Sequence, residues 1–232
     1  MTTALHIEIA SDIVCPWCYI GKRRLEAALE LFAAKYPDHS RPHVSWIAFQ
    51  LNPDLPLSGM SRADYLQRKF GSPDGGGMYE RVSAEGRKEG IDFNFAAIKR
   101  QPNTLRSHAL LAAALKSDET ANLQARLKEA LMKAYFCEGA DLTQEATLIH
   151  IAESAGMPPE ATQAVLRDTA AHEEVAAQDA ELRRIGISGV PFIIINRQLG
   201  VSGAQSPEAL LAAMEQALGA AGASSQEVAA DF

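Results

Sequence analysis

The stretch Ser11-Asp12-Ile13-Val14-Cys15-Pro16-Trp17-Cys18 decides how this chain of 232 residues is interpreted. Before it, residues 5–10 alternate between apolar and polar side chains, a pattern typical of a short strand. After it, apolar residues recur at three- and four-residue spacing until Pro37, which predicts a helix that starts near Cys15. The C-x-x-C motif is therefore expected between the end of a strand and the start of a helix.

This position predicts different roles for the two thiols. A thiol at a helix N-terminus faces the positive end of the helix dipole and free N–H donors, which lower its pKa. We therefore expect Cys15 to be the acidified nucleophile and Cys18 to attack a mixed disulfide formed at Cys15. Pro16 suits a first helical turn, because that turn does not need its missing N–H. Trp17 is expected to be exposed and to contact a partner.

Other interpretations of these residues stay open. A structural zinc site needs about four Cys or His ligands, and haem attachment needs a His where Tyr19 stands, so both are weaker than a redox dithiol. Two inert, buried cysteines are a further alternative. Asp12 either accepts a proton from Cys18 or caps the turn. Cys137 is either a small buried hydrophobe or a regulatory thiol.

Composition excludes several classes of protein. The chain has 47% hydrophobic and 22% charged residues, as in ordinary globular proteins. Its 22 basic and 29 acidic residues give a net charge of −7, which argues against nucleic acid or an anionic membrane as the main partner. No secretory signal or apolar run of about 20 residues is apparent, so a cytoplasmic protein is expected. In a reducing cytosol, three cysteines are not expected to form structural disulfides.

The rest of the chain divides into strand-bearing and helical parts. Residues 43–51 are rich in β-formers and predict a second strand, which the first helix would join to the first strand in a parallel βαβ unit. Residues 61–186 have almost no strand pattern. Strand character returns at 192–195 and 199–201, before a last helix that starts at Pro207. The predicted thiol-bearing domain consists of residues 1–60 and 187–220. An all-helical domain, residues 61–186, is inserted into it, and residues 221–232 form a flexible C-terminal tail.

A second informative motif is Gly189-Val190-Pro191-Phe192, directly before the strand at 192–195. Proline at a strand start is compatible with ordinary edge geometry. However, a strand, a C-x-x-C helix, a second strand, a distant hairpin opened by X-Pro and a closing helix follow the order of a thioredoxin fold. In that fold the X-Pro bond is cis and packs against the C-x-x-C motif. The backbone of Val190 would then be free to pair with an extended substrate beside Pro191.

Together these and further motifs resemble the FrnE-type branch of the DsbA-like proteins, over about residues 5–218. The segments that carry the resemblance are 11–21, Phe49-Gln50-Leu51-Asn52-Pro53, Asn103-Thr104 with His108, 135–141, 189–192 and Val201-Ser202-Gly203-Ala204-Gln205. The resemblance implies an α/β thioredoxin fold with a large inserted helical domain, a cis Val190-Pro191 bond and a cytoplasmic thiol–disulfide oxidoreductase activity. It is more specific than C-x-x-C alone.

The same superfamily contains kappa-class glutathione transferases and 2-hydroxychromene-2-carboxylate isomerases. They bind glutathione and carry Ser where Cys15 stands, a departure that separates this chain from them. By resemblance to the kappa class, Asn103 and residues 202–205 would contact glutathione. Asn103 is also expected to cap the helix that carries His108, and His108 either reaches the cleft or packs internally. Asn103 and His108, with Val190 and Pro191, form the expected substrate-binding set.

The sequence thus predicts an enzyme that oxidises, reduces or isomerises protein or small-molecule disulfides through a CPWC dithiol. No metal or organic cofactor is expected to be required, and glutathione is a candidate redox partner. The expected partners are thiol- or disulfide-containing proteins. Binding to nucleic acid or to a membrane is not expected. The protein itself is expected to be a monomer or a homodimer. Two alternatives remain: a glutathione-dependent isomerase or transferase on the same fold, and a redox-inert peptide-binding or chaperone module.

Overall fold

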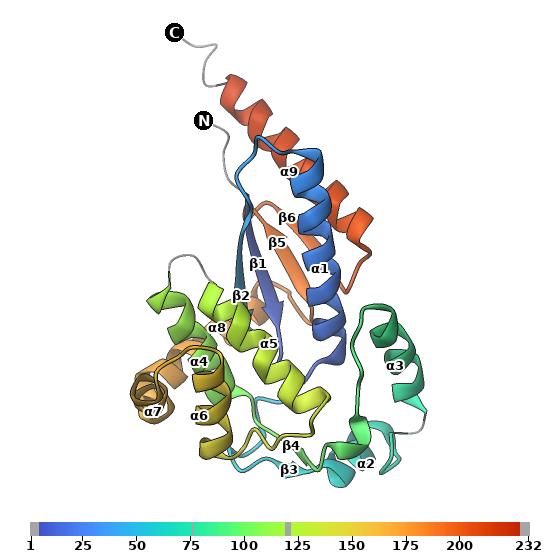
Figure 1. Ribbon diagram of the computed structural model, residues 1–232, viewed down its shortest axis with the longest axis vertical. Helices are drawn as coiled ribbons and strands as arrows, with labels where there is room; N and C mark the ends of the chain where they lie inside the picture. The colour runs from blue at the N-terminus through green and yellow to red at the C-terminus, as the bar shows by residue number, and fades with distance from the viewer. Residues whose placement is uncertain (1–4, 76, 119–121, 228–232) are drawn as a thin grey trace.

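The computed structural model describes residues 5–75, 77–118 and 122–227 (Figure 1). The chain begins with β1 (His6–Ser11), α1 (Pro16–Lys35) and β2 (His43–Ala48). Then follow β3 (Met60–Ser61), α2 (Arg62–Phe70), α3 (Met78–Lys88), the 3-10 helix η1 (Phe95–Ala97), β4 (Arg100–Gln101), α4 (Leu105–Ser117), α5 (Asn122–Phe136), α6 (Glu145–Ser154), α7 (Pro159–Arg167) and α8 (Thr169–Arg184). The chain returns to the sheet with β5 (Phe192–Ile195) and β6 (Leu199–Ser202), and α9 (Pro207–Glu227) follows.

The main sheet has the strand order β2-β1-β5-β6. β1 pairs in parallel with β2, as predicted from the βαβ order, and antiparallel with β5, which forms a hairpin with β6. β2 ends at Ala48, three residues before the predicted end. After that residue the chain leaves the sheet, and the backbone N–H of Leu51 donates a hydrogen bond to the carboxylate of Asp12.

Apolar side chains cover both faces of this sheet. On one face, Ile7 and Ile9 of β1 pack with Leu25 and Phe32 of α1 and with Met214 of α9. On the other face, a smaller cluster joins the sheet to α8 and the segment that follows it, through Ala10, Phe49, Phe192, Leu182 and Ile187. Figure 1 shows α1 and α9 side by side along the sheet. This is the layered arrangement expected for a thioredoxin fold.

The inserted helices gather beyond the end of the sheet at which β1 leads into α1 (Figure 1). The prediction that this segment is all-helical was wrong in one detail, because β3 and β4 pair antiparallel through Met60–Gln101 and Ser61–Arg100. Strands of two residues are too short to show a period-2 pattern in the sequence. The predicted boundaries of the two domains stay a prediction.

The last helix is longer than expected. The sequence predicts a flexible tail from residue 221, but α9 continues to Glu227, so residues 221–227 are helical. Gly219 and Gly222 each lower helix stability by only about 1 kcal/mol, which the alanines around them can offset. Residues 228–232 lie outside the described residues. Among the described helices, none is long and apolar enough to cross a membrane.

Candidate redox site at the start of helix α1

The C-x-x-C motif lies where the sequence placed it, at the junction of β1 and α1. Cys15 is the extended N-cap residue of α1, and Pro16 is its first helical residue. The backbone N–H of Cys18 donates to the carbonyl of Cys15 at 3.0 Å, which closes the first turn. Cys15 is 5% exposed and Cys18 is fully buried. The sulfur of Cys15 is therefore the accessible one.

The loop before β5 packs against these thiols. The Val190-Pro191 peptide bond is cis, as predicted. The Cys15 Sγ–H donates to the carbonyl oxygen of Val190 at 3.6 Å. Pro191 approaches α1 at Gly21, where an added Cβ would lie 3.0 Å from the Pro191 Cγ. The absence of a side chain at Gly21 therefore allows the cis-proline loop to lie against the start of α1.

A buried cation lies behind Cys18. Lys128 of α5 is fully buried, and its Nζ donates to the Ser11 Oγ at 2.8 Å. Burial opposes ionisation of Cys18, but a hydrogen bond from Cys15, the charge of Lys128 and a hydrogen bond from Ser11 outweigh it and lower the pKa of Cys18. Burial also lowers the pKa of Lys128, to about 8.

The two thiols titrate as a pair. The hydrogen bond to Cys18 and burial raise the pKa of Cys15 well above its ordinary value. Because the two sulfurs share a hydrogen bond, these directions belong to the dithiol as a unit, and the expectation that Cys15 is the acidified thiol stays a prediction. The first proton lost from the pair leaves one negative charge, which the second sulfur stabilises by its hydrogen bond. Transfer of the remaining proton between the two sulfurs would place the thiolate on Cys15.

Asp12 connects the motif to distant segments. Its carboxylate accepts the N–H of Leu51 at 2.7 Å and lies 3.3 Å from the His108 Nε2. Burial would raise the pKa of Asp12, but the hydrogen bond and charge of His108 and the hydrogen bond from Leu51 lower it overall. The backbone of Asp12, and not its carboxylate, hydrogen-bonds to Cys18. Asp12 thus neither caps the turn with its side chain nor contacts the Cys18 thiol through it.

The two other predicted substrate residues are held inside the protein. The Asn103 side-chain amide donates to the carbonyls of Pro53 and Leu55, and its oxygen accepts the N–H of Leu105, the first residue of α4. The N-cap position itself is Thr104, so Asn103 contacts the helix start from one residue before the cap. His108 is 2% exposed and faces Asp12. Neither residue lines the pocket at Cys15. Direct substrate contact by Asn103 and His108 stays a prediction.

A cavity of about 220 Å³ opens beside Cys15. Its inner side is formed by the redox motif and the segment after β2, and its outer side by helices α2 and α3 of the insertion. The lining residues are Val14, Cys15, Pro16, Trp17, Leu51, Arg62, Tyr65, Lys69, Phe70, Met78, Tyr79 and Val82. Trp17 is only partly exposed, and Arg81 lies 5.9 Å from the centre of its ring.

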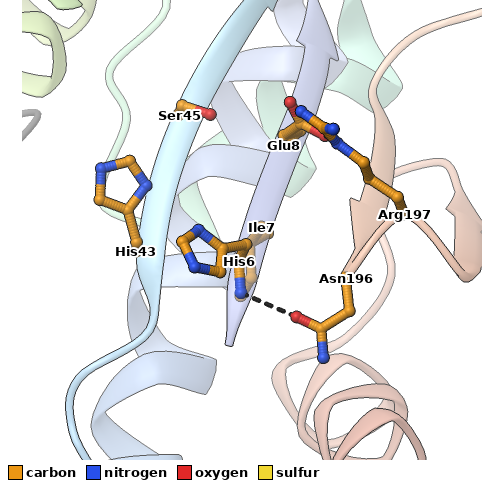
Figure 2. Close-up of a pocket in the computed structure, with 7 residues that line it drawn as sticks. All are labelled: His6, Ile7, Glu8, His43, Ser45, Asn196 and Arg197. Carbon is orange, nitrogen blue, oxygen red and sulfur yellow. Dashed lines mark hydrogen bonds and ion pairs between the residues drawn. The ribbon is translucent and has the colours of Figure 1, made fainter. Parts of the chain in front are cut away.

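A larger cavity, of about 440 Å³, lies at the opposite end of β1. Figure 2 shows His6 and Glu8 of β1 beside His43 of β2, with Arg197 and Asn196 from the β5–β6 turn. The backbone N–H of His6 donates to the Asn196 side chain at 2.9 Å, and Arg197 lies 3.4 Å from Glu8. This cavity has no cysteine in its lining and is separate from the redox site.

Sequence reasoning missed the residues that the inserted helices bring to the thiols. Lys128 and Arg62 each belong to a helical pattern in which Lys and Arg normally face solvent, so no local signal marks them as buried. Cys137 is partly exposed just after α5, and burial together with the charges of Glu138 and Asp92 raises its pKa.

The model of the DSBA-like thioredoxin domain matches residues 6–215. The chain belongs to this family. It is 31% identical to a probable DsbA oxidoreductase from Streptomyces coelicolor, with a TM-score of 0.79 over 93% of this chain and 90% of the other. The family assignment and the arrangement of the elements together confirm the DsbA-like thioredoxin fold with its helical insertion.

Two further structures share this DsbA-like fold at lower identity. The cytosolic disulfide reductase DsbM from Pseudomonas aeruginosa with GSH is 17% identical, with a TM-score of 0.65 over 92% of this chain and 98% of the other. A 2-hydroxychromene-2-carboxylate isomerase is 16% identical, with a TM-score of 0.60 over 96% and 98%. At these identities the likeness extends to the fold alone.

Proposed function

We propose that this DsbA-like protein is a thiol–disulfide oxidoreductase of the FrnE type, in which Cys15 attacks and Cys18 resolves. The observation that carries the proposal is the difference in access between the two sulfurs. Cys15 lines a cavity and contacts the Val190 carbonyl, whereas Cys18 is fully buried and lines none of that cavity. An external disulfide can therefore reach Cys15 first.

The proposed reaction is two successive exchanges. The Cys15 thiolate attacks one sulfur of the substrate disulfide, forms a mixed disulfide and releases the other substrate sulfur as a thiolate. The Cys18 thiolate then attacks the Cys15 sulfur, which forms the Cys15–Cys18 disulfide and releases the second substrate thiolate. Two electrons pass from the protein to the substrate, and each released thiolate takes up a proton. The reverse sequence oxidises a substrate dithiol, so the same site serves oxidation, reduction and isomerisation.

Lys128 and Ser11 stabilise the charge at Cys18 that the second exchange requires. The backbone of Val190 would pair with an extended substrate beside Pro191. The reaction needs no bound cofactor, and glutathione would serve as a redox partner. We also propose a cytoplasmic location, which agrees with the cytosolic DsbM structure.

Reduction of insulin by a thiol reductant, followed by turbidity, tests this function against its two alternatives. We expect Cys15→Ser and Cys18→Ser each to lose the activity and Cys137→Ser to retain it. Full activity in Cys18→Ser would show that the reduction does not use the second cysteine of this chain, and would contradict the resolving role of Cys18. Absence of reduction by the unmodified protein would favour a redox-inert binding module.

A further inference from the structure

A buried guanidinium forms part of the wall of the cavity at Cys15. Arg62 is the first residue of α2 and is 8% exposed. Its Nη1 donates to the Gln101 side-chain oxygen and, at 3.4 Å, to the Tyr135 hydroxyl, and its Nη2 donates to the Tyr79 hydroxyl. All three partners are neutral. In the part of the chain that the structure describes, no carboxylate lies within ion-pair distance of Arg62.

A buried charge without a counter-ion costs stability, because the cation has lost its hydration. Besides its neutral hydrogen bonds, the Arg62 guanidinium lies 5.3 Å from the centre of the Tyr65 ring and 5.5 Å from that of the Tyr79 ring, contacts that offset only part of this cost. The hydrogen bonds to the two tyrosine hydroxyls and the amide oxygen do not require a positive charge, and the contacts with the tyrosine rings leave that charge without an anionic partner. The guanidinium group is, however, well suited to a carboxylate, which it can bind through two parallel N–H donors. The position of Arg62 at the cavity therefore points to an anionic group on a ligand.

The neighbouring wall adds a second cation and aromatic surface. The Lys69 Nζ donates to the Tyr65 hydroxyl at 2.7 Å and lies 5.6 Å from the centre of the Phe70 ring. Within the described residues, Lys69 also has no carboxylate at ion-pair distance. Phe70 and Met78 complete the apolar part of this wall. A ligand that combines a negative charge with an aromatic or apolar body matches both properties.

We propose that the cavity between α2, α3 and Cys15 binds the carboxylate-bearing part of a small aromatic or apolar disulfide or thiol, with Arg62 as the specificity-determining residue. This inference rests on the proposed function. A cavity of about 220 Å³ can hold a group of the size of a substituted benzoate, but it cannot hold a folded protein segment. The sulfur of such a ligand would lie at Cys15, and its carboxylate at Arg62.

The covalent step is the first exchange described above. The Cys15 thiolate forms a bond to one sulfur of the ligand disulfide, the ligand S–S bond breaks, and the other half leaves as a thiolate with the bonding electron pair. No additional oxidant is required, because the ligand disulfide is reduced as Cys15 is oxidised.

Two aromatic disulfides of opposite character provide the test, in the full chain with Cys18→Ala and Cys137→Ser so that Cys15 reacts alone. One is 5,5′-dithiobis(2-nitrobenzoate), which carries a carboxylate on each ring, and the other is the neutral 2,2′-dithiodipyridine. The measured quantity is the ratio of their second-order rate constants. The two reagents have different leaving groups, but this difference is the same in every variant. A change in the reactivity of Cys15 affects both rate constants of a variant alike, so it does not change their ratio.

We expect Arg62→Gln to lower the anionic-to-neutral ratio by about tenfold, because a charge-assisted hydrogen bond is lost. Arg62→Lys should retain most of the ratio. Arg87→Gln, which removes an exposed charge from α3, is the matched control and should leave the ratio unchanged. An unchanged ratio in Arg62→Gln, or an equal fall in both rates, would overturn the proposal.

A second measurement does not depend on the folding of an Arg62 variant. In the Cys18→Ala, Cys137→Ser protein, benzoate should slow the reaction of Cys15 with dithiodipyridine, whereas the neutral isostere benzamide should not. Equal effects of benzoate and benzamide would contradict the anionic site. Failure of Cys15 to react with either disulfide would instead count against the proposed function itself.

Discussion

The sulfur of Cys15 and the carbonyl oxygen of Val190 lie 3.6 Å apart, although 175 positions separate the two residues in the sequence. The contact joins the start of α1 to the loop before β5, across the whole helical insertion. It places the backbone that would receive an extended substrate directly beside the reactive sulfur.

Lys128 is expected to set the pH at which the dithiol loses its first proton. Replacement by Met keeps the length of the side chain but removes the charge behind Cys18. The midpoint of thiolate formation should then move up by about one pH unit, since a nearby opposite charge favours the ionised thiol. Thiolate absorbance in the ultraviolet measures this midpoint. Lys133→Met is the control, because Lys133 is on the same helix and is 63% exposed.

The same charge limits thiolate stabilisation at alkaline pH. The pKa of Lys128 is lowered to about 8, so the support it gives the thiolate is present below that pH and is lost as the pH rises through it. An unchanged midpoint in Lys128→Met would show that Ser11 and the Asp12 backbone stabilise the thiolate without the cation.

Asp12 is expected to make the stability of the protein depend on acid pH. Its pKa is lowered in the folded state, so its contribution is present above the unfolded value of about 3.9 and is lost as the pH falls through the folded value. Asp12→Asn should lower the free energy of unfolding at pH 7 by about 2 kcal/mol. Below about pH 4, the free energy of unfolding should also decrease less steeply with falling pH than in the parent protein. Denaturant unfolding at several pH values measures both effects.

Asp54→Asn provides the comparison for Asp12, because Asp54 is exposed. It should leave the free energy of unfolding within about 0.5 kcal/mol of the parent. If Asp12→Asn has the same pH profile as the parent, the contacts of Asp12 with Leu51 and His108 do not stabilise its charged form.

Glu129 is expected to hold the inserted helices to α1. Its carboxylate accepts from Lys22 at 2.6 Å and from Tyr19 at 2.7 Å, and Lys22 is 4% exposed. Glu129→Gln leaves this buried cation with one acidic partner, Glu26, and should lower the free energy of unfolding by about 1–3 kcal/mol. Glu129 is partly exposed, which keeps the loss below that of a fully buried pair.

The matched control for Glu129 is Glu30→Gln. Glu30 is 75% exposed and lies 3.4 Å from Arg41, so the change should have an effect of less than about 0.5 kcal/mol. Equal losses in the two variants, measured by denaturant unfolding, would show that the contacts of Glu129 contribute no more than a surface ion pair.

Local patterns predicted most of the fold. The strand at Phe192–Ile195 and the helix start at Pro16 depend on neighbouring residues, and Val190-Pro191 is cis as its place in the fold order implied. Lys128 and Arg62 could not be assigned in this way. Their burial depends on how α5 and α2 pack on the thioredoxin part, a long-range property that helical spacing does not encode.

Cys15 and Cys18 have unequal roles in the proposed reaction, and covalent trapping measures this difference directly. Each single Cys→Ser variant is incubated with glutathione disulfide and analysed by mass spectrometry without reduction, with Cys137 also replaced by Ser. We predict that the Cys18→Ser protein accumulates a mixed disulfide at Cys15, because the resolving thiol is absent. The Cys15→Ser protein should remain unmodified, since Cys18 is fully buried. Equal trapping in both variants, or trapping in Cys15→Ser alone, would contradict the assignment of nucleophile and resolving thiol.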